Sequence, residues 1–116
     1  MELALGEIDG DVMVVRVDGG LNQATAQQIG EQVGALVAGG VRHVIVDCSS
    51  LTVLSSIGIG VLLMLHTRMK HEGGDVRLCG LRGLVMQVLQ LAKLDRMFQF
   101  YPDVGQAKLS FRPRSN

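Results

Sequence analysis

The sequence has no tryptophan and few other aromatic residues, which make up only 3% of its 116 residues. Proteins that bind single-stranded nucleic acids without sequence preference stack the bases on aromatic side chains, so this kind of binding is disfavoured. Eleven basic residues balance eleven acidic ones, so no net positive charge attracts the chain to nucleic acids or to an anionic membrane. We therefore expect neither as a partner.

Long apolar runs and cysteine-rich patterns are also missing. No run reaches the ~18 apolar residues of a membrane-spanning helix, and the N-terminal segment lacks the basic region and apolar stretch of a signal peptide. The two cysteines, Cys48 and Cys79, are too few and too far apart for a disulfide framework or a zinc knuckle. These features predict a cytoplasmic protein with two reduced, buried thiols.

Aliphatic side chains are abundant. Apolar residues make up 47% of the chain, which is enough for the core of one domain of this length. Because aromatic residues are scarce, this core must be built from valine, leucine, isoleucine and methionine. We expect residues 1–116 to form a single domain, with residues 112–116 as a frayed tail.

The order of the apolar segments predicts an α/β fold. Two strands joined by the turn-like Asp9-Gly10-Asp11 form an expected β-hairpin. After this hairpin, helical spacing of apolar residues alternates with short β-branched runs. The expected strands are residues 3–8, 12–17, 41–47, 76–79 and 97–100, and the expected helices are residues 22–38 or 25–38, 56–72, 84–91 and 103–109. This alternation favours a mixed sheet of about four to five strands with helices packed against it.

The segment 44–65, VIVDCSSLTVLSSIGIGVLLML, is the most informative part of the chain. Its opening strand suits burial on both faces, and residues 57–65 are almost all apolar or glycine, which predicts a helix packed on more than one side. At least one of Leu62 and Leu63 should therefore be fully buried. Ser55 or Ser56 falls at the helix N-cap, where the positive end of the helix dipole favours a phosphate. We place the function at this serine pair.

These motifs, in this order, resemble the STAS domain, and in detail a bacterial anti-sigma factor antagonist. The resemblance covers nearly the whole chain. Each motif is weak by itself, but their order and spacing are fairly specific. The motifs are GGLN at residues 19–22 with TA at 25–26, VIVD at 44–47, LSSIGIGVL at 54–62, GGDVRL at 73–78, VL at 88–89 and LD at 94–95.

The resemblance implies a phosphorylation switch rather than an enzyme. In that family, a serine at the start of the apolar helix is phosphorylated by a partner kinase that is also the anti-sigma factor. The unmodified antagonist binds this kinase and frees the sigma factor. Ser56 matches the phosphoacceptor, and as an N-cap its hydroxyl would be open to a kinase. The expected docking surface lies at one end of the sheet and contains Asn22, Gln23, Ser55, Ile57 and Gly58.

Three positions depart from the family pattern. Ser55 and Asn22 stand where acidic residues are expected, and Ile57 replaces a small polar residue. The loss of two carboxylates eases the approach of a phosphate, yet it also removes contacts that a kinase uses to orient the acceptor. A role in binding survives these changes more easily than phosphorylation does. The plainest alternative is that Ser55 and Ser56 only cap the helix.

Two other classes of protein stay open. A STAS subunit of a membrane lipid-transport complex would dock on an ATPase without being phosphorylated, and the missing acidic residues make this the second choice. An enzyme is disfavoured because no base accompanies any nucleophile and Ser56 lacks the Gly-x-Ser-x-Gly elbow of hydrolases. The three histidines, His43, His66 and His71, lack the spacing of metal ligands. We expect no metal and no cofactor.

Overall fold

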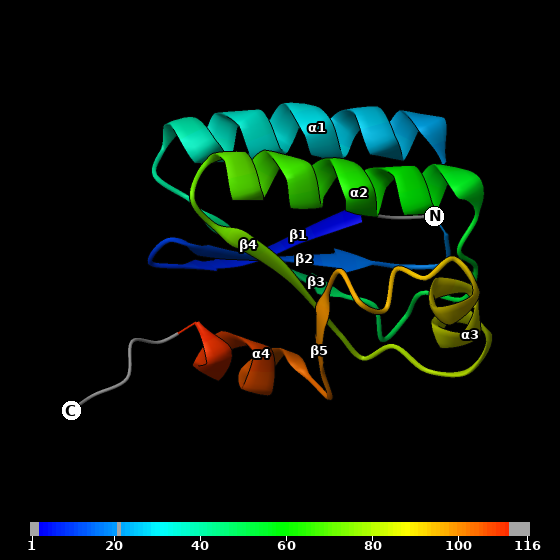
Figure 1. The fold of residues 1–116 in the computed structure, drawn as a ribbon. Helices are drawn as coiled ribbons and strands as arrows, with labels where there is room; N and C mark the ends of the chain where they lie inside the picture. Colours follow the sequence, from blue (N-terminus) through cyan, green and yellow to red (C-terminus); the bar gives the residue numbers. More distant parts are fainter. Residues whose placement is uncertain (1–2, 21, 112–116) are drawn as a thin grey trace.

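The computed structural model describes residues 3–20 and 22–111, and Figure 1 shows how they fold. Within these residues the expected element order is confirmed, and the bounds differ from the expected ones by two residues at most. Residues 112–116, the expected tail, lie outside the described residues. The elements are β1 (Leu3–Asp9), β2 (Val12–Val17), α1 (Gln23–Ala38), β3 (His43–Asp47), α2 (Ser56–His71), β4 (Asp75–Cys79), α3 (Gly83–Leu91), β5 (Gln99–Tyr101) and α4 (Val104–Ser110).

The described strands form one mixed sheet of five, in the order β1-β2-β3-β4-β5. β1 and β2 are the expected antiparallel hairpin, whereas β2 through β5 pair in parallel. Parallel neighbours require a crossover, and α1, α2 and α3 provide the three crossovers. Each of these helices therefore begins at the edge of the sheet where its preceding strand ends. Figure 1 shows the first turns of α1 and α2 together at this edge.

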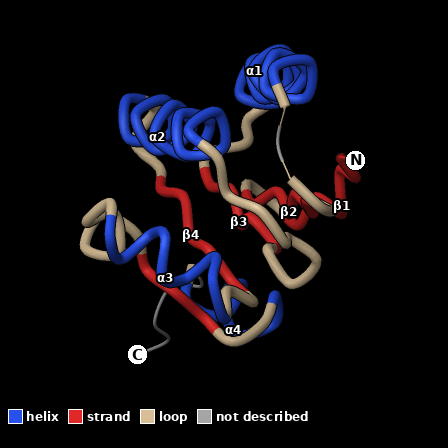
Figure 2. Tube along the Cα trace, turned by 90° about the vertical axis from the view of Figure 1, so that its right-hand side faces the viewer, coloured by secondary structure: helices blue, strands red, loops and turns tan. Residues whose placement is uncertain are grey.

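The central strand, β3, is buried on both faces, as the sequence predicts. Val44 and Val46 belong to the larger core, which α1, α2 and α3 cover. Ile45 points to the opposite face, where it joins a smaller core with Cys79 and Ala107 of α4. Figure 2 shows α1 and α2 on one side of the sheet and α4 on the other. Helices thus cover both faces of the sheet at β3.

The end of α2 depends on two glycines. Gly73 has a φ of 82°, a left-handed conformation that glycine adopts readily. A Cβ atom at Gly74 would overlap the backbone carbonyl group of Arg42. This close approach places the chain to enter β4 beside β3.

Both cysteines lie in the described part of the chain, where they are buried and free. Cys48 belongs to the larger core and Cys79 to the smaller one. Burial raises the pKa of both thiols, that of Cys79 to about 12. Because the thiolate is the reactive form, these side chains act as packing groups at neutral pH.

His43 is half-buried at the opposite edge of the sheet, where β3 begins. Its Nδ1 accepts a hydrogen bond from the backbone N–H of Asp75 at 3.1 Å, and its ring lies 4.4 Å from that of Phe111. Desolvation lowers the pKa of His43 below its ordinary value of 6.5, although the nearby carboxylate of Asp11 opposes this shift. The fold therefore favours the neutral imidazole.

A loss of stability at acid pH follows from this arrangement. Between pH 6.5 and the lower pKa of folded His43, the unfolded chain binds a proton that the folded chain does not, so the free energy of unfolding falls as the pH falls. Urea denaturation between about pH 5 and pH 8 measures this slope. His43→Gln is expected to flatten the slope, whereas His71→Gln, at an exposed position, leaves it unchanged. Equal slopes in all three proteins would contradict the assignment to His43.

Candidate protein-docking site

The loop between β3 and α2 is bound to the loop between β2 and α1. The carbonyl oxygen of Gly19 accepts hydrogen bonds from the N–H groups of Thr52 and Val53, at 2.7 and 3.1 Å. The N–H of Gly19 donates to the carbonyl oxygen of Ser50 at 2.9 Å. The two loops that lead into α1 and α2 are thus joined by backbone bonds, although they are far apart in the sequence.

Ser55 is the N-cap of α2. Its backbone is extended, with φ −93° and ψ 176°, and its Oγ accepts a hydrogen bond from the N–H of Gly58 at 3.3 Å. Its carbonyl oxygen accepts the first helical bond, from Ile59. Of the two serines that the sequence offers as the N-cap, Ser55 is therefore confirmed, and the description of Ser56 as an N-cap is wrong. Only the extended residue before the helix can turn its side chain back to the free N–H groups.

Ser56 is the first residue of α2, and it is exposed. Among residues 3–20 and 22–111, no side chain or backbone group forms a hydrogen bond with its hydroxyl. The first turn of α2 contains no acidic residue, so the positive end of the helix dipole is not neutralised there. This position combines a free hydroxyl with a field that favours a phosphate.

Asn22 plays at α1 the role that Ser55 plays at α2. Its Oδ1 accepts hydrogen bonds from both the N–H and the hydroxyl of Thr25, each at 2.9 Å. Asn22 and the following Gln23 are exposed. The two residues proposed from sequence for docking therefore lie at the first turn of α1, at the same edge of the sheet as Ser56.

A groove of about 380 Å³ separates the first turns of α1 and α2. Gln23 lines it from α1, and Ile57, whose side chain is 43% exposed, lines it from α2. The tertiary structure thus brings together two of the residues that the sequence places on the docking surface. Its lining residues are Gln23, Ala26, Gln27, Ile57, Gly60, Val61 and Met64.

Gly58 does not belong to this exposed surface. It is buried, and its N–H is used by the cap of α2. A large side chain at this position would disturb folding before it disturbed docking. Gly60, two residues later, is exposed, and a Cβ atom there would meet no atom within 4 Å. Gly60 therefore leaves room in the groove. The packing of α1 against α2 does not require a glycine at this position.

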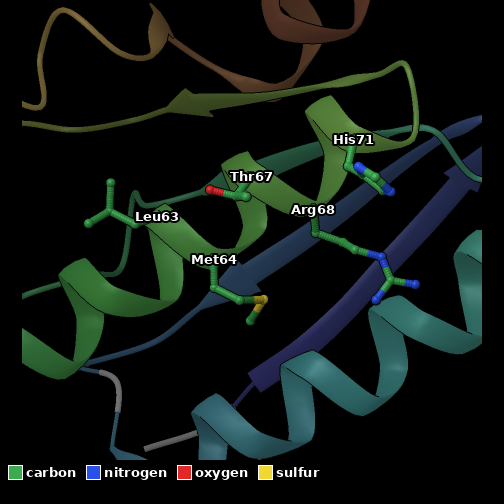
Figure 3. A pocket seen from close by; sticks show the side chains of 5 residues that line it. All are labelled: Leu63, Met64, Thr67, Arg68 and His71. Carbon is green, nitrogen blue, oxygen red and sulfur yellow. The ribbon is translucent and has the colours of Figure 1, made fainter.

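A second hollow follows the outer face of α2 toward its C-terminus. It has a volume of about 490 Å³ and is lined by Leu63, Met64, Thr67, Arg68 and His71, which Figure 3 shows as sticks. Met64 also lines the first groove, so the two hollows adjoin each other at this side chain. The second hollow differs from the first because it ends at basic side chains.

A third groove, of about 240 Å³, lies on the other side of the loop between β3 and α2. It separates this loop from α3. The docking surface expected from the sequence does not include this groove. One sequence signal could have identified it: apart from Gln87 and Gln90, every side chain of α3 is apolar, which is more apolar surface than one buried face of a helix requires. Its lining residues are Thr52, Val53, Leu54, Leu84, Val85 and Val88.

Two other features are absent from the described residues. No group of three His, Cys, Asp or Glu side chains there is arranged to hold a metal ion. None of the described helices has both the length and the apolar character needed to cross a membrane. In the residues described, the chemical features that stand out are an exposed serine and the uncharged grooves beside it.

Comparison with known proteins gave consistent results. The model of the STAS domain family matches residues 5–107. BtrV of Bordetella bronchiseptica, which has the provisional name of anti-sigma factor antagonist, is 30% identical over 92 residues, or 79% of this chain and 78% of BtrV. An anti-sigma factor antagonist from Mycobacterium paratuberculosis has a similar structure, with a TM-score of 0.78 and 27% identity over 97% of this chain and 94% of that one. The anti-sigma factor antagonist SpoIIAA in its unphosphorylated form shares the fold, with a TM-score of 0.84 and 20% identity over 99% of this chain and 100% of SpoIIAA.

Proposed function

Because the chain belongs to the STAS domain family, we propose that it is an anti-sigma factor antagonist that works by partner switching. The unmodified chain binds an anti-sigma factor that is also a serine kinase, and this binding frees the sigma factor. Phosphorylation of Ser56 by the kinase ends the binding. The chain itself carries out no catalysis in this scheme.

The position of Ser56 is the observation that carries the proposal. Its exposed hydroxyl stands at the first residue of a helix of 16 residues, next to a groove whose lining residues are all uncharged. A kinase can reach this hydroxyl without unfolding the chain. The field of the helix then stabilises the phosphate that is formed.

The replacement of two acidic residues by Asn22 and Ser55 is compatible with this role. Both residues cap their helices through side-chain oxygens, and asparagine and serine are among the best N-caps. The local structure of the site therefore does not need the two carboxylates. Their absence also removes two negative charges that would repel the phosphate.

Phosphorylation would act through charge and desolvation. A phosphoserine has a charge of about −1.5 to −2 at neutral pH. Covering this charge with a partner removes its hydration, which is costly unless the partner supplies a cation. The docking surface is neutral before modification and strongly anionic afterwards. The partner therefore binds the two forms of the chain with clearly different affinities.

The test is capture of partners from the native cell, followed by incubation with ATP and mapping of phosphorylated residues by mass spectrometry. We expect a histidine-kinase-like ATPase as the partner and a phosphate on Ser56. Capture of a transporter ATPase, with no phosphate on the chain, would instead support the second choice, a STAS subunit of a lipid-transport complex. Turnover of a substrate by the isolated chain would contradict both.

A further inference from the structure

α3 is an apolar helix of which one side remains exposed. Its sequence, GLVMQVLQL, has Gln87 and Gln90 as its only polar side chains, and because they are three residues apart they share one side of the helix. Val85 and Leu89 are buried in the larger core. Leu84 and Leu91, however, are 75% and 83% exposed. The packing of the described residues does not explain why two leucines stand exposed on this helix.

The first turn of α3 lies close to the serine pair. Leu84 and Val88 form one wall of the third groove, and residues 52–54 form the other. These loop residues lead directly into Ser55. Since β3 and β4 are parallel neighbours, α2 and α3 start at the same edge of the sheet, and Figure 1 shows α3 near the first turn of α2. Two grooves therefore adjoin the start of α2, one toward α1 and one toward α3.

The two grooves have the same chemistry. None of the side chains that line either groove is charged, and the first turns of α1, α2 and α3 contain no acidic residue. Three large apolar side chains at this edge are exposed: Val53 by 60%, Ile57 by 43% and Leu84 by 75%. Depletion of charge and exposure of large apolar side chains are typical of the centre of a protein–protein interface.

The size of a stable interface also favours a contact beyond the first groove. A specific interface buries about 800 Å² on each partner and involves about 20–30 residues a side. The residues expected from sequence are too few for this area, and Gly58 among them is buried. A partner that reaches Ser56 must therefore cover neighbouring surface, and the third groove offers uncharged surface directly beside it.

We propose that the anti-sigma factor that docks at Ser56 also inserts an apolar side chain into the groove between residues 52–54 and α3, with Leu84 as the main contact. This inference rests on the proposed function for the identity of the partner. It adds α3, on the far side of Ser56 from α1, to the docking surface. It also assigns to the partner an apolar anchor rather than a charged one.

The test compares two substitutions on the same helix. Leu84→Ser removes the wall of the groove, whereas Leu91→Ser makes the same chemical change about 10 Å further along α3, away from residues 52–54. Both leucines are largely exposed, so both variants should retain the melting temperature of the parent. In titration calorimetry with the anti-sigma factor captured by the parent chain, Leu84→Ser should weaken binding at least about tenfold. Leu91→Ser should change it less than about twofold.

A second variant probes the opposite wall of the same groove. Val53→Ser should weaken binding in the same direction as Leu84→Ser, and this result does not depend on how well the α3 variant folds. A parent chain that binds no anti-sigma factor would overturn the proposed function. If the parent binds and Ile57→Ser weakens the complex while Leu84→Ser and Val53→Ser do not, only the contact at α3 is overturned. Equal effects of Leu84→Ser and Leu91→Ser would overturn it as well.

Discussion

Replacement of Ser56 by aspartate is expected to weaken binding of the anti-sigma factor at least tenfold. The change places a full negative charge beside groove residues that are uncharged. A charge that is covered by a partner without a matching cation loses its hydration and gains nothing in return. A penalty of only ~1.4 kcal/mol already reduces the affinity tenfold. Ser56→Ala, which cannot accept a phosphate, should bind as tightly as the unmodified parent and keep binding in the presence of ATP. Titration calorimetry with and without ATP measures both results.

The neighbouring serine supplies the matched control. Ser55→Ala removes the hydrogen bond by which the Ser55 side chain caps α2 at the N–H of Gly58. It should therefore lower the free energy of unfolding by ~0.5–2 kcal/mol while leaving the phosphoacceptor, Ser56, in place. Ser56→Asp should not destabilise the fold, since a carboxylate in the first turn interacts well with the helix dipole. A phosphate found on Ser55 would move the switch by one residue. Binding that persists with no phosphate on either serine would leave only docking without phosphorylation.

Leu62→Ala should cost about 2–5 kcal/mol of the free energy of unfolding. Leu62 is 2% exposed and belongs to the larger core beneath α2, so its truncation leaves a cavity as well as removing apolar contact. Small domains have a total stability of about 5–15 kcal/mol, so this loss is a large share. Urea denaturation at constant pH measures the effect.

Leu63 is the control, because it is the next residue of the same helix but only half-buried. Leu63→Ala should therefore cause a clearly smaller loss, since part of its side chain is already in water. The sequence predicts that at least one of the two leucines is fully buried, and the burial of Leu62 confirms this. Equal losses at the two positions, or a loss under about 1 kcal/mol at Leu62, would contradict the role of Leu62 in the core.

The elements of the fold could be predicted from sequence because their signals are local. The alternation of β-branched runs with helical spacing identified the strands and the helices, and Asn22 was recognised as a possible start of α1, which its cap to Thr25 confirms. The burial of β3 on both faces was also predicted correctly from its unbroken apolar run. In these cases the residues that form the structure are neighbours in the chain.

The site was predicted only in part. The sequence indicated that a serine caps α2, but it did not distinguish Ser55 from Ser56, because the choice depends on which residue has the extended backbone. It also placed Gly58 on the docking surface, although this glycine is buried and Gly60 is exposed. The rotation of α2 about its own axis decides which glycine faces outward, and packing on the sheet sets this rotation.

The sequence by itself determined the order and type of the elements, the aliphatic core and the serine pair at the start of an apolar helix. Only the tertiary structure decided which segments lie beside that pair. Residues 52–54 and Leu84 share a groove because β3 and β4 are parallel neighbours, so both strands end, and α2 and α3 both begin, at the same edge of the sheet. Such a contact depends on strand pairing between distant segments, for which local patterns carry no signal.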